Sequence, residues 1–172
     1  MSLLKIIEAP DPRLRVISSP VDGVDDELRS LMDQMLETMY AAPGIGLSAI
    51  QVNIPKRVIV LDIAGSEEDP DPRYFVNPEI VWQSDEMENY KEGCLSLPEY
   101  YAEVERPGAC HIRHLDYDGK EHLLKAEGLL ATCIQHEIDH LEGILFVDYL
   151  SVLRRNMILR KLAKAHREED ST

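Results

Sequence analysis

The sequence LLATCIQHEIDHL at residues 129–141 is the stretch on which the fold depends. Its apolar residues recur with helical spacing, which predicts an amphipathic helix with one buried face. Within that helix His136 and His140 lie on the same face, one turn apart. Two imidazoles in this arrangement can bind one metal ion, and the adjacent Glu137 can take a proton from a water on that ion. The alternative is a solvated polar face that carries two incidental histidines.

The segments around this helix predict an α+β fold. Periodic apolar residues predict a helix over 25–40, and Ser151 can cap a last helix that reaches about Arg167. Strand-like segments occupy residues 57–63, 74–82, 101–105, 111–117 and 121–126. Between the last two, Asp118-Gly119 predicts a two-residue hairpin turn. Because hairpins pair their strands antiparallel, we expect mixed or antiparallel sheets packed around a central metal-binding helix, with N-terminal and C-terminal helices.

Length, charge and cysteine content narrow the class of protein. The 172 residues fit one domain over residues 1–172. Lys and Arg number 18 against 32 Asp and Glu, and a net charge of −14 argues against a protein that wraps nucleic acid. No apolar run approaches the roughly 20 residues of a membrane span, and the N-terminus does not resemble a signal peptide. Three cysteines without an export signal favour the reducing cytoplasm, and Cys110, just before a predicted strand, is expected to be structural.

A catalytic metal site usually has three protein ligands, so a third must come from outside the two histidines. One large protease group has a further histidine where this chain has Phe146, which cannot bind metal. Cys133 lies seven residues from His140, about 10.5 Å along a helix, and is expected in the pocket wall or core. Cys94, in the sequence EGCLSLP, remains the candidate ligand, with a buried structural cysteine as the alternative.

The segment GIGLSAIQ at residues 44–51 is the third candidate for the site. Its two glycines permit a close backbone approach but are not a dinucleotide-binding fingerprint, because no third glycine follows at the required place. Gln51 offers a side-chain amide that could donate a hydrogen bond to a developing oxyanion. An ordinary surface glutamine is the alternative.

Together, these three segments resemble the peptide deformylase family. The family motifs are G-φ-G-φ-A-A-x-Q, E-G-C-φ-S and H-E-x-D-H, and this chain has GIGLSAIQ, EGCLS and HEIDH in the same order over about residues 4–165. The resemblance implies removal of the formyl group from the N-terminal formylmethionine of new polypeptides, with release of formate. One departure is Ser48, which stands where the family has its first alanine. Its hydroxyl needs a partner if buried, and we expect it to touch no catalytic position.

The resemblance also assigns the metal chemistry. Cys94, His136 and His140 match the metal ligands of the family, and Glu137 matches its general acid and base. Family members typically use one divalent ion, natively Fe²⁺, for which Zn²⁺, Ni²⁺ or Co²⁺ can substitute in vitro. Two other classes stay open from the residues alone: a metal-free thiol hydrolase with Cys94 as nucleophile and His136 as base, and a structural zinc module with four protein ligands.

The substrate-binding residues follow from the same resemblance. Gln51 and the backbone N–H of Leu95 match the donors that stabilise the oxyanion, and Gly46 matches a backbone position that pairs with the extended peptide. The methionine pocket is expected to be apolar, and its predicted walls are Ile45, Tyr90 and Cys133. Asp139 either orients a histidine or pairs with Arg106, and we favour the pairing.

The last predicted helix is strongly basic. Its bases within residues 151–167 are Arg154, Arg155, Arg160, Lys161, Lys164 and Arg167. That segment has no acid, so the rest of the chain has 12 bases against 32 acids, or −20. A basic helix could hold a monomeric enzyme on ribosomal RNA beside the nascent chains that form its substrate. The alternative is a solvated helix whose cations suit its own C-terminal end and the acidic body.

Overall fold

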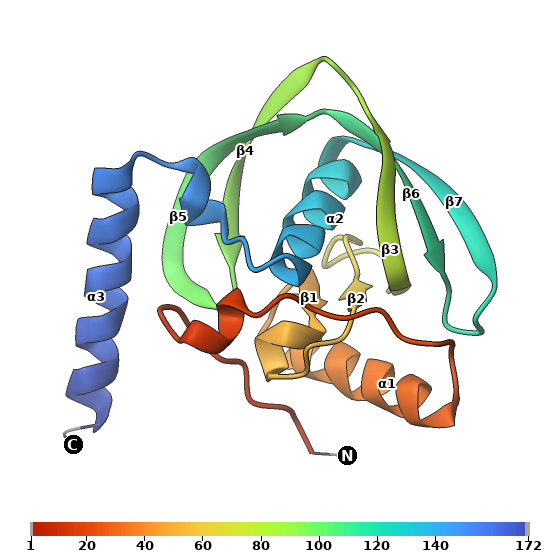
Figure 1. Ribbon diagram of the computed structural model, residues 1–172, viewed down its shortest axis with the longest axis horizontal. Helices are drawn as coiled ribbons and strands as arrows, with labels where there is room; N and C mark the ends of the chain where they lie inside the picture. The colour runs from red at the N-terminus through yellow and green to blue at the C-terminus, as the bar shows by residue number, and fades with distance from the viewer. Residues whose placement is uncertain (1, 171–172) are drawn as a thin grey trace.

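The helix predicted at residues 129–141 is α2 (Gly128–Leu141), and in a computed structural model of the chain it lies between two antiparallel sheets (Figure 1). The structure describes residues 2–170. One sheet has five strands in the order β1-β2-β3-β6-β7, and the other is the pair β4-β5. The predicted α+β fold, with antiparallel sheets around a central helix, is therefore confirmed.

The five-stranded sheet separates two helices. Its strands are β1 (Gly46–Ser48), β2 (Val58–Leu61), β3 (Arg73–Gln83), β6 (Ala109–Leu115) and β7 (Glu121–Glu127). All four residues of β2 are buried, because successive side chains point to opposite faces and both faces are covered. Val58 and Val60 pack in the cluster with α1 (Asp26–Ala41), and Ile59 and Leu61 pack in the cluster with α2. This two-sided burial explains the continuous apolar run of the strand.

The two-stranded sheet is a long hairpin of β4 (Met87–Cys94) and β5 (Leu97–Pro107). The sequence did not predict β4, because MENYKEGC is polar and lacks strand periodicity. The predicted two-residue turn at Asp118-Gly119 is also wrong, since β6 and β7 are joined by residues 116–120. The Asp116 carboxylate accepts hydrogen bonds from the backbone N–H groups of Asp118 and Lys120, which fixes this longer turn.

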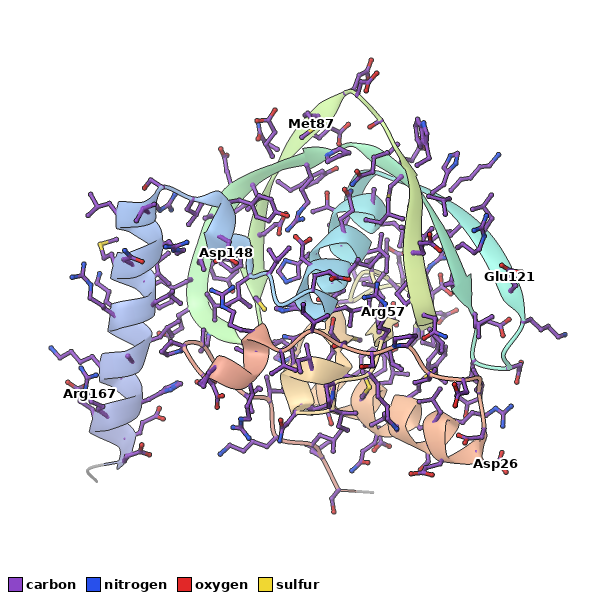
Figure 2. The ribbon with its side chains drawn as sticks, in the orientation of Figure 1. Asp26, Arg57, Met87, Glu121, Asp148 and Arg167 are labelled. Carbon is purple, nitrogen blue, oxygen red and sulfur yellow. The ribbon has the colours of Figure 1, made fainter. Side chains whose placement is uncertain are left out.

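The terminal helices form as the sequence predicts. The Asp25 side chain accepts a hydrogen bond from the N–H of Leu28 and caps α1. The C-terminal helix α3 (Val152–Asp170) lies along the outside of the β4–β5 sheet and is anchored through buried Ile158 and Leu162 (Figure 1). Figure 2 shows Arg167 on this outer helix, where its side chain is exposed. Within residues 2–170, no helix is long and apolar enough to cross a bilayer.

Three short 3-10 helices complete the fold. They are η1 (Pro12–Arg15), η2 (Ala49–Val52) and η3 (Phe146–Tyr149). η2 directly follows β1, so the glycine-rich segment ends in a tight turn beside α2. η3 precedes α3, and its Asp148, labelled in Figure 2, pairs with Arg15 at 2.6 Å between Oδ2 and Nη1.

Candidate active site and metal centre

Three side chains converge beside the middle of α2. The ligand atoms of Cys94, His136 and His140 all lie within 4.8 Å of one another. The Nε2 atom of His140 is 3.2 Å from Cys94 Sγ and 3.2 Å from His136 Nε2. One ion bound tetrahedrally, with bonds of about 2.0–2.3 Å, needs ligand atoms separated by about 3.3–3.6 Å. One thiolate and two imidazoles also suit a borderline-soft divalent ion, so these residues fit a metal.

The three ligand atoms reach this point from two separate elements. One turn of α2 separates His136 from His140, as their spacing predicts. Cys94 ends β4, where a register shift between Gly93 and Cys94 redirects the chain. The absence of a side chain on Gly93 leaves room for the Tyr101 ring, since a Cβ would lie 2.4 Å from one of its carbons. Among residues 2–170 no fourth ligand joins the group, which argues against the closed set of a structural zinc site.

A buried ion-pair network fixes the orientation of His136. Its Nδ1 lies 2.9 Å from Glu92 Oε1, so its Nε2 faces the cluster. Arg106 binds Glu92 through two hydrogen bonds, of 2.6 and 3.0 Å, and donates to Asp139 at 2.8 Å. Burial by itself raises the pKa of Glu92, but His136 and Arg106 outweigh it and lower that pKa. The predicted pairing of Asp139 with Arg106 is confirmed, whereas the part played by Glu92 was missed.

Glu137 lies beside the cluster in a dry environment. Its side chain is almost fully buried, and burial raises the pKa of its carboxyl group. Its Oε1 is 3.9 Å from His136 Nε2. A Cβ on Gly46 would lie 2.9 Å from the same oxygen, so the glycine permits β1 to approach the carboxyl group. A buried carboxyl with a raised pKa suits a group that must accept and return a proton.

Ser48 contacts Glu137, the candidate for proton transfer, although the sequence predicted no contact with the candidate catalytic residues. The Ser48 side chain is fully buried, with its Oγ 2.7 Å from Glu137 Oε2 and 2.9 Å from the Glu137 carbonyl oxygen. The sequence could not show this contact, because the two residues are 89 positions apart and meet only when β1 packs on α2.

Gln51 is buried beside Cys94, so its interpretation as an ordinary surface residue is wrong. Its Oε1 accepts a hydrogen bond from the Ser48 N–H at 2.9 Å. Its Nε2 donates to Ser96 Oγ at 3.0 Å and lies 3.5 Å from Cys94 Sγ. The amide nitrogen is therefore held next to the ligand cluster. Leu95, which follows Cys94, lines the same cleft.

A cleft of about 830 Å³ opens onto these residues. Ile45, Tyr90 and Cys133, the predicted pocket walls, all line it, as does Gly46. Burial, with help from nearby carboxylates, raises the pKa of the Cys133 thiol to about 12, so this wall is uncharged. Among the lining residues that the sequence did not predict are Leu129, Thr132 and Tyr101. The first two lie four positions before Cys133 and His136, so helical spacing could have identified them.

Known proteins resemble this chain over nearly its whole length. Residues 3–156 match the family described as polypeptide deformylase. A peptide deformylase of Pelagibacter ubique is 60% identical over 164 residues, which cover 95% of each chain. One from Maricaulis maris is 58% identical over 170 residues, covering 99% of this chain and 98% of the relative.

Solved structures agree with the sequence comparison. The crystal structure of peptide deformylase from Ehrlichia chaffeensis matches with a TM-score of 0.92 and 42% identity, covering 98% of this chain and 99% of that one. A second structure of that protein, in complex with actinonin, matches with a TM-score of 0.92 and 43% identity over 97% of this chain and 99% of that one. The fold, the three motifs and these relatives together show that the chain belongs to the peptide deformylase family of hydrolases.

Proposed function

We propose that this chain hydrolyses the N-formyl group of the N-terminal formylmethionine of newly made polypeptides and releases formate, in a reaction that needs one divalent metal ion. The observation that carries this proposal is the convergence of Cys94, His136 and His140 beside buried Glu137 in one cleft. Membership of the peptide deformylase family supports the substrate, and the ligand cluster supports the metal.

Cys94, His136 and His140 would hold the ion, which we infer is Fe²⁺ in the cell and can be replaced by Zn²⁺, Ni²⁺ or Co²⁺ in vitro. The thiolate reduces the net charge of a divalent site and favours a soft or borderline ion. When bound, such an ion supplies a Lewis acid that lowers the pKa of water and polarises a carbonyl group.

Glu137 moves the proton. As the water oxygen attacks the formyl carbon, Glu137 accepts one proton from that water. The carbonyl oxygen becomes an oxyanion, and we assign its stabilisation to the Gln51 amide and the backbone N–H of Leu95. Glu137 then passes its proton to the amide nitrogen while the carbon–nitrogen bond breaks. The products are the free amine and formic acid, which ionises to formate.

The substrate binds, on this proposal, as an extended peptide beside β1. β1 is an edge strand of the five-stranded sheet, so its outer side can pair with a further strand through Gly46. Ile45, Tyr90 and Cys133 enclose the methionine side chain in the cleft. The formyl carbon bears only hydrogen, so a tight site beside Glu137 would exclude an acetyl group by size.

The cellular setting is part of the same proposal. Residues 1–172 act as one catalytic unit, a monomer that works in the cytoplasm, where nascent chains emerge from ribosomes. Helix α3 contacts ribosomal RNA through its basic residues. Its exposed bases support this assignment, because residues 151–167 have six bases and no acid while the rest of the chain carries a charge of −20.

Anaerobic purification followed by metal quantification and a formate-release assay tests the activity. We expect about one metal ion per chain and formate from formyl-Met peptides, with no acetate from the matched acetyl-Met peptides. Full activity in a protein stripped of metal would contradict the metal-dependent mechanism and favour the thiol hydrolase with Cys94 as nucleophile.

A further inference from the structure

Ser48 ends β1 at the point where this strand crosses α2. Its hydroxyl is inaccessible to solvent, with Oγ 2.7 Å from Glu137 Oε2 and 2.9 Å from the Glu137 carbonyl oxygen. Because the hydroxyl contacts Oε2, the other carboxyl oxygen, Oε1, faces the cleft. There it lies 3.9 Å from His136 Nε2 and next to Gly46. The hydroxyl contact therefore distinguishes the two carboxyl oxygens, of which Oε1 faces the cleft.

A hydroxyl has one proton to donate and lone pairs with which to accept. When Glu137 is ionised, Ser48 can donate its proton to Oε2. The Glu137 carbonyl oxygen is a second acceptor, so the hydroxyl lies between the carboxyl group and the backbone of the same residue. Both acceptors lie within hydrogen-bond distance of Oγ, and these contacts restrict rotation of the Glu137 carboxyl group.

From these contacts we propose that Ser48 is a positioning residue that holds the Glu137 carboxyl group with Oε1 turned towards the cleft. The role rests on the proposed function, in which Glu137 takes up a proton and returns it. The Ser48 backbone N–H also binds Gln51 Oε1 at 2.9 Å, so one residue orients both groups that flank the formyl carbon. Alanine, the family residue at this position, keeps the backbone contact and lacks the hydroxyl, so the hydroxyl adjusts the rate of catalysis and is not indispensable for it.

Ser48→Ala in the metal-loaded enzyme tests the role, and Ser18→Ala is the matched control. Ser18 is also buried, but its hydroxyl has no hydrogen-bond partner within residues 2–170 and lies outside the site. We expect Ser48→Ala to lower kcat about tenfold, the scale of one lost hydrogen bond in the transition state, with KM unchanged within about twofold. Metal content stays the same in both variants. Unchanged kcat in Ser48→Ala, or an equal loss in Ser18→Ala, overturns the role.

A double-mutant cycle with Glu137→Ala supplies a readout that does not depend on activity. The folding equilibrium constant of the double variant should be about fivefold or more above the value calculated by adding the effects of the two single variants. The reason is that each single variant already loses the contact between Ser48 and Glu137. In the Glu137→Ala background, Ser48→Ala should cause no further loss of residual activity. An inactive wild type overturns the proposed function, whereas an active wild type without this coupling overturns the role of Ser48 alone.

Discussion

At the scale of single residues, the ligand cluster depends on side chains that do not belong to it. Glu92 is the clearest case, since it binds His136 on one side and Arg106 on the other and has almost no exposed surface. Removing Arg106 would leave the buried Glu92 carboxylate without its bidentate cationic partner, which typically costs about 3–5 kcal/mol.

Glu137→Gln tests the proton transfer. The amide has nearly the same shape, so the fold and metal content should be retained, but it cannot take up a proton. We expect kcat to fall at least about 10²–10⁴-fold, the usual contribution of a general base. Formate release and metal content measured on the same sample check this, and near-normal turnover would remove Glu137 from the mechanism.

Gln51→Ala tests the oxyanion role. Loss of one preorganised donor typically lowers kcat by about 10²–10³-fold, because the charge on the carbonyl oxygen develops only in the transition state. KM should change much less. Steady-state kinetics on a formyl-Met peptide separate the two effects, and a rise in KM alone would show that Gln51 binds the ground state.

At the scale of elements, Asp62 shows how buried polar contacts connect them, because it joins the end of α1 to the loop after β2. Its carboxylate accepts hydrogen bonds from the Tyr40 hydroxyl at 2.5 Å and from the N–H groups of Ala64 and Asp71. Burial alone raises the pKa of Asp62, but these donors outweigh it and lower the pKa below its usual 3.8. The stabilisation is therefore present above about pH 4 and is lost as the pH falls through the lowered value.

Asp62→Asn should accordingly destabilise the protein in a pH-dependent way. We expect a loss of about 1–3 kcal/mol in the free energy of unfolding at pH 7, which shrinks towards zero below the folded-state pKa. Urea unfolding from pH 7 down to the acid limit of the native state measures this. Exposed Asp85 provides the control Asp85→Asn, which removes the same charge. A pH-independent loss would contradict the role of the carboxylate.

Helix α3 carries the prediction about the ribosome. Changing Arg154, Arg155, Lys161 and Lys164 to Gln should weaken cosedimentation with ribosomes at low salt by tenfold or more, and high salt should weaken binding of the wild type. The control changes Lys5, Lys56, Lys120 and Lys125 to Gln, because these exposed lysines lie outside α3 and remove the same charge. Equal binding by the two variants would leave α3 as an ordinary solvated helix.

The elements also show where sequence patterns succeed and fail. The helical period predicted α1 and α2 almost to the residue, because each buries one apolar face. β4 carries no such signal, since it belongs to a hairpin of which much is exposed to solvent. Contacts between segments that are far apart in the sequence could not be predicted from it either. The bond from Ser48 to Glu137 spans 89 positions, and that from His136 to Glu92 spans 44.

At the scale of the whole molecule, three apolar clusters surround the site. One joins α1 to the five-stranded sheet, the second joins that sheet to α2, and the third joins β5 to η3 and α3. Cys94 packs beside the third cluster, whereas α2 belongs to the second. The ligand cluster therefore lies at the boundary between two separately packed parts of the protein.

Removal of the metal should consequently destabilise the whole protein. A ligand that binds only the native state adds RT ln(1 + [L]/Kd), or about 4 kcal/mol at a thousandfold excess over Kd. We expect the Tm to fall on chelation and to rise with added Co²⁺ or Zn²⁺. Calorimetry of stripped and reloaded protein measures both, and Cys94→Ser should blunt the response. An identical Tm with and without metal would show that the ion contributes nothing to folding.

Cys94 lies in the β4–β5 hairpin and both histidines lie on α2. A bound ion would therefore link these two elements as a cross-link does. Cys94 and His140 are 46 positions apart, and a covalent bridge over such a span removes chain entropy from the unfolded state worth about 4 kcal/mol. The β4–β5 hairpin and α2 should then unfold together and not separately. In hydrogen–deuterium exchange, the amides of β4, β5 and α2 should share one slow opening rate while metal is bound. After its removal they should separate into two populations, with the hairpin exchanging first.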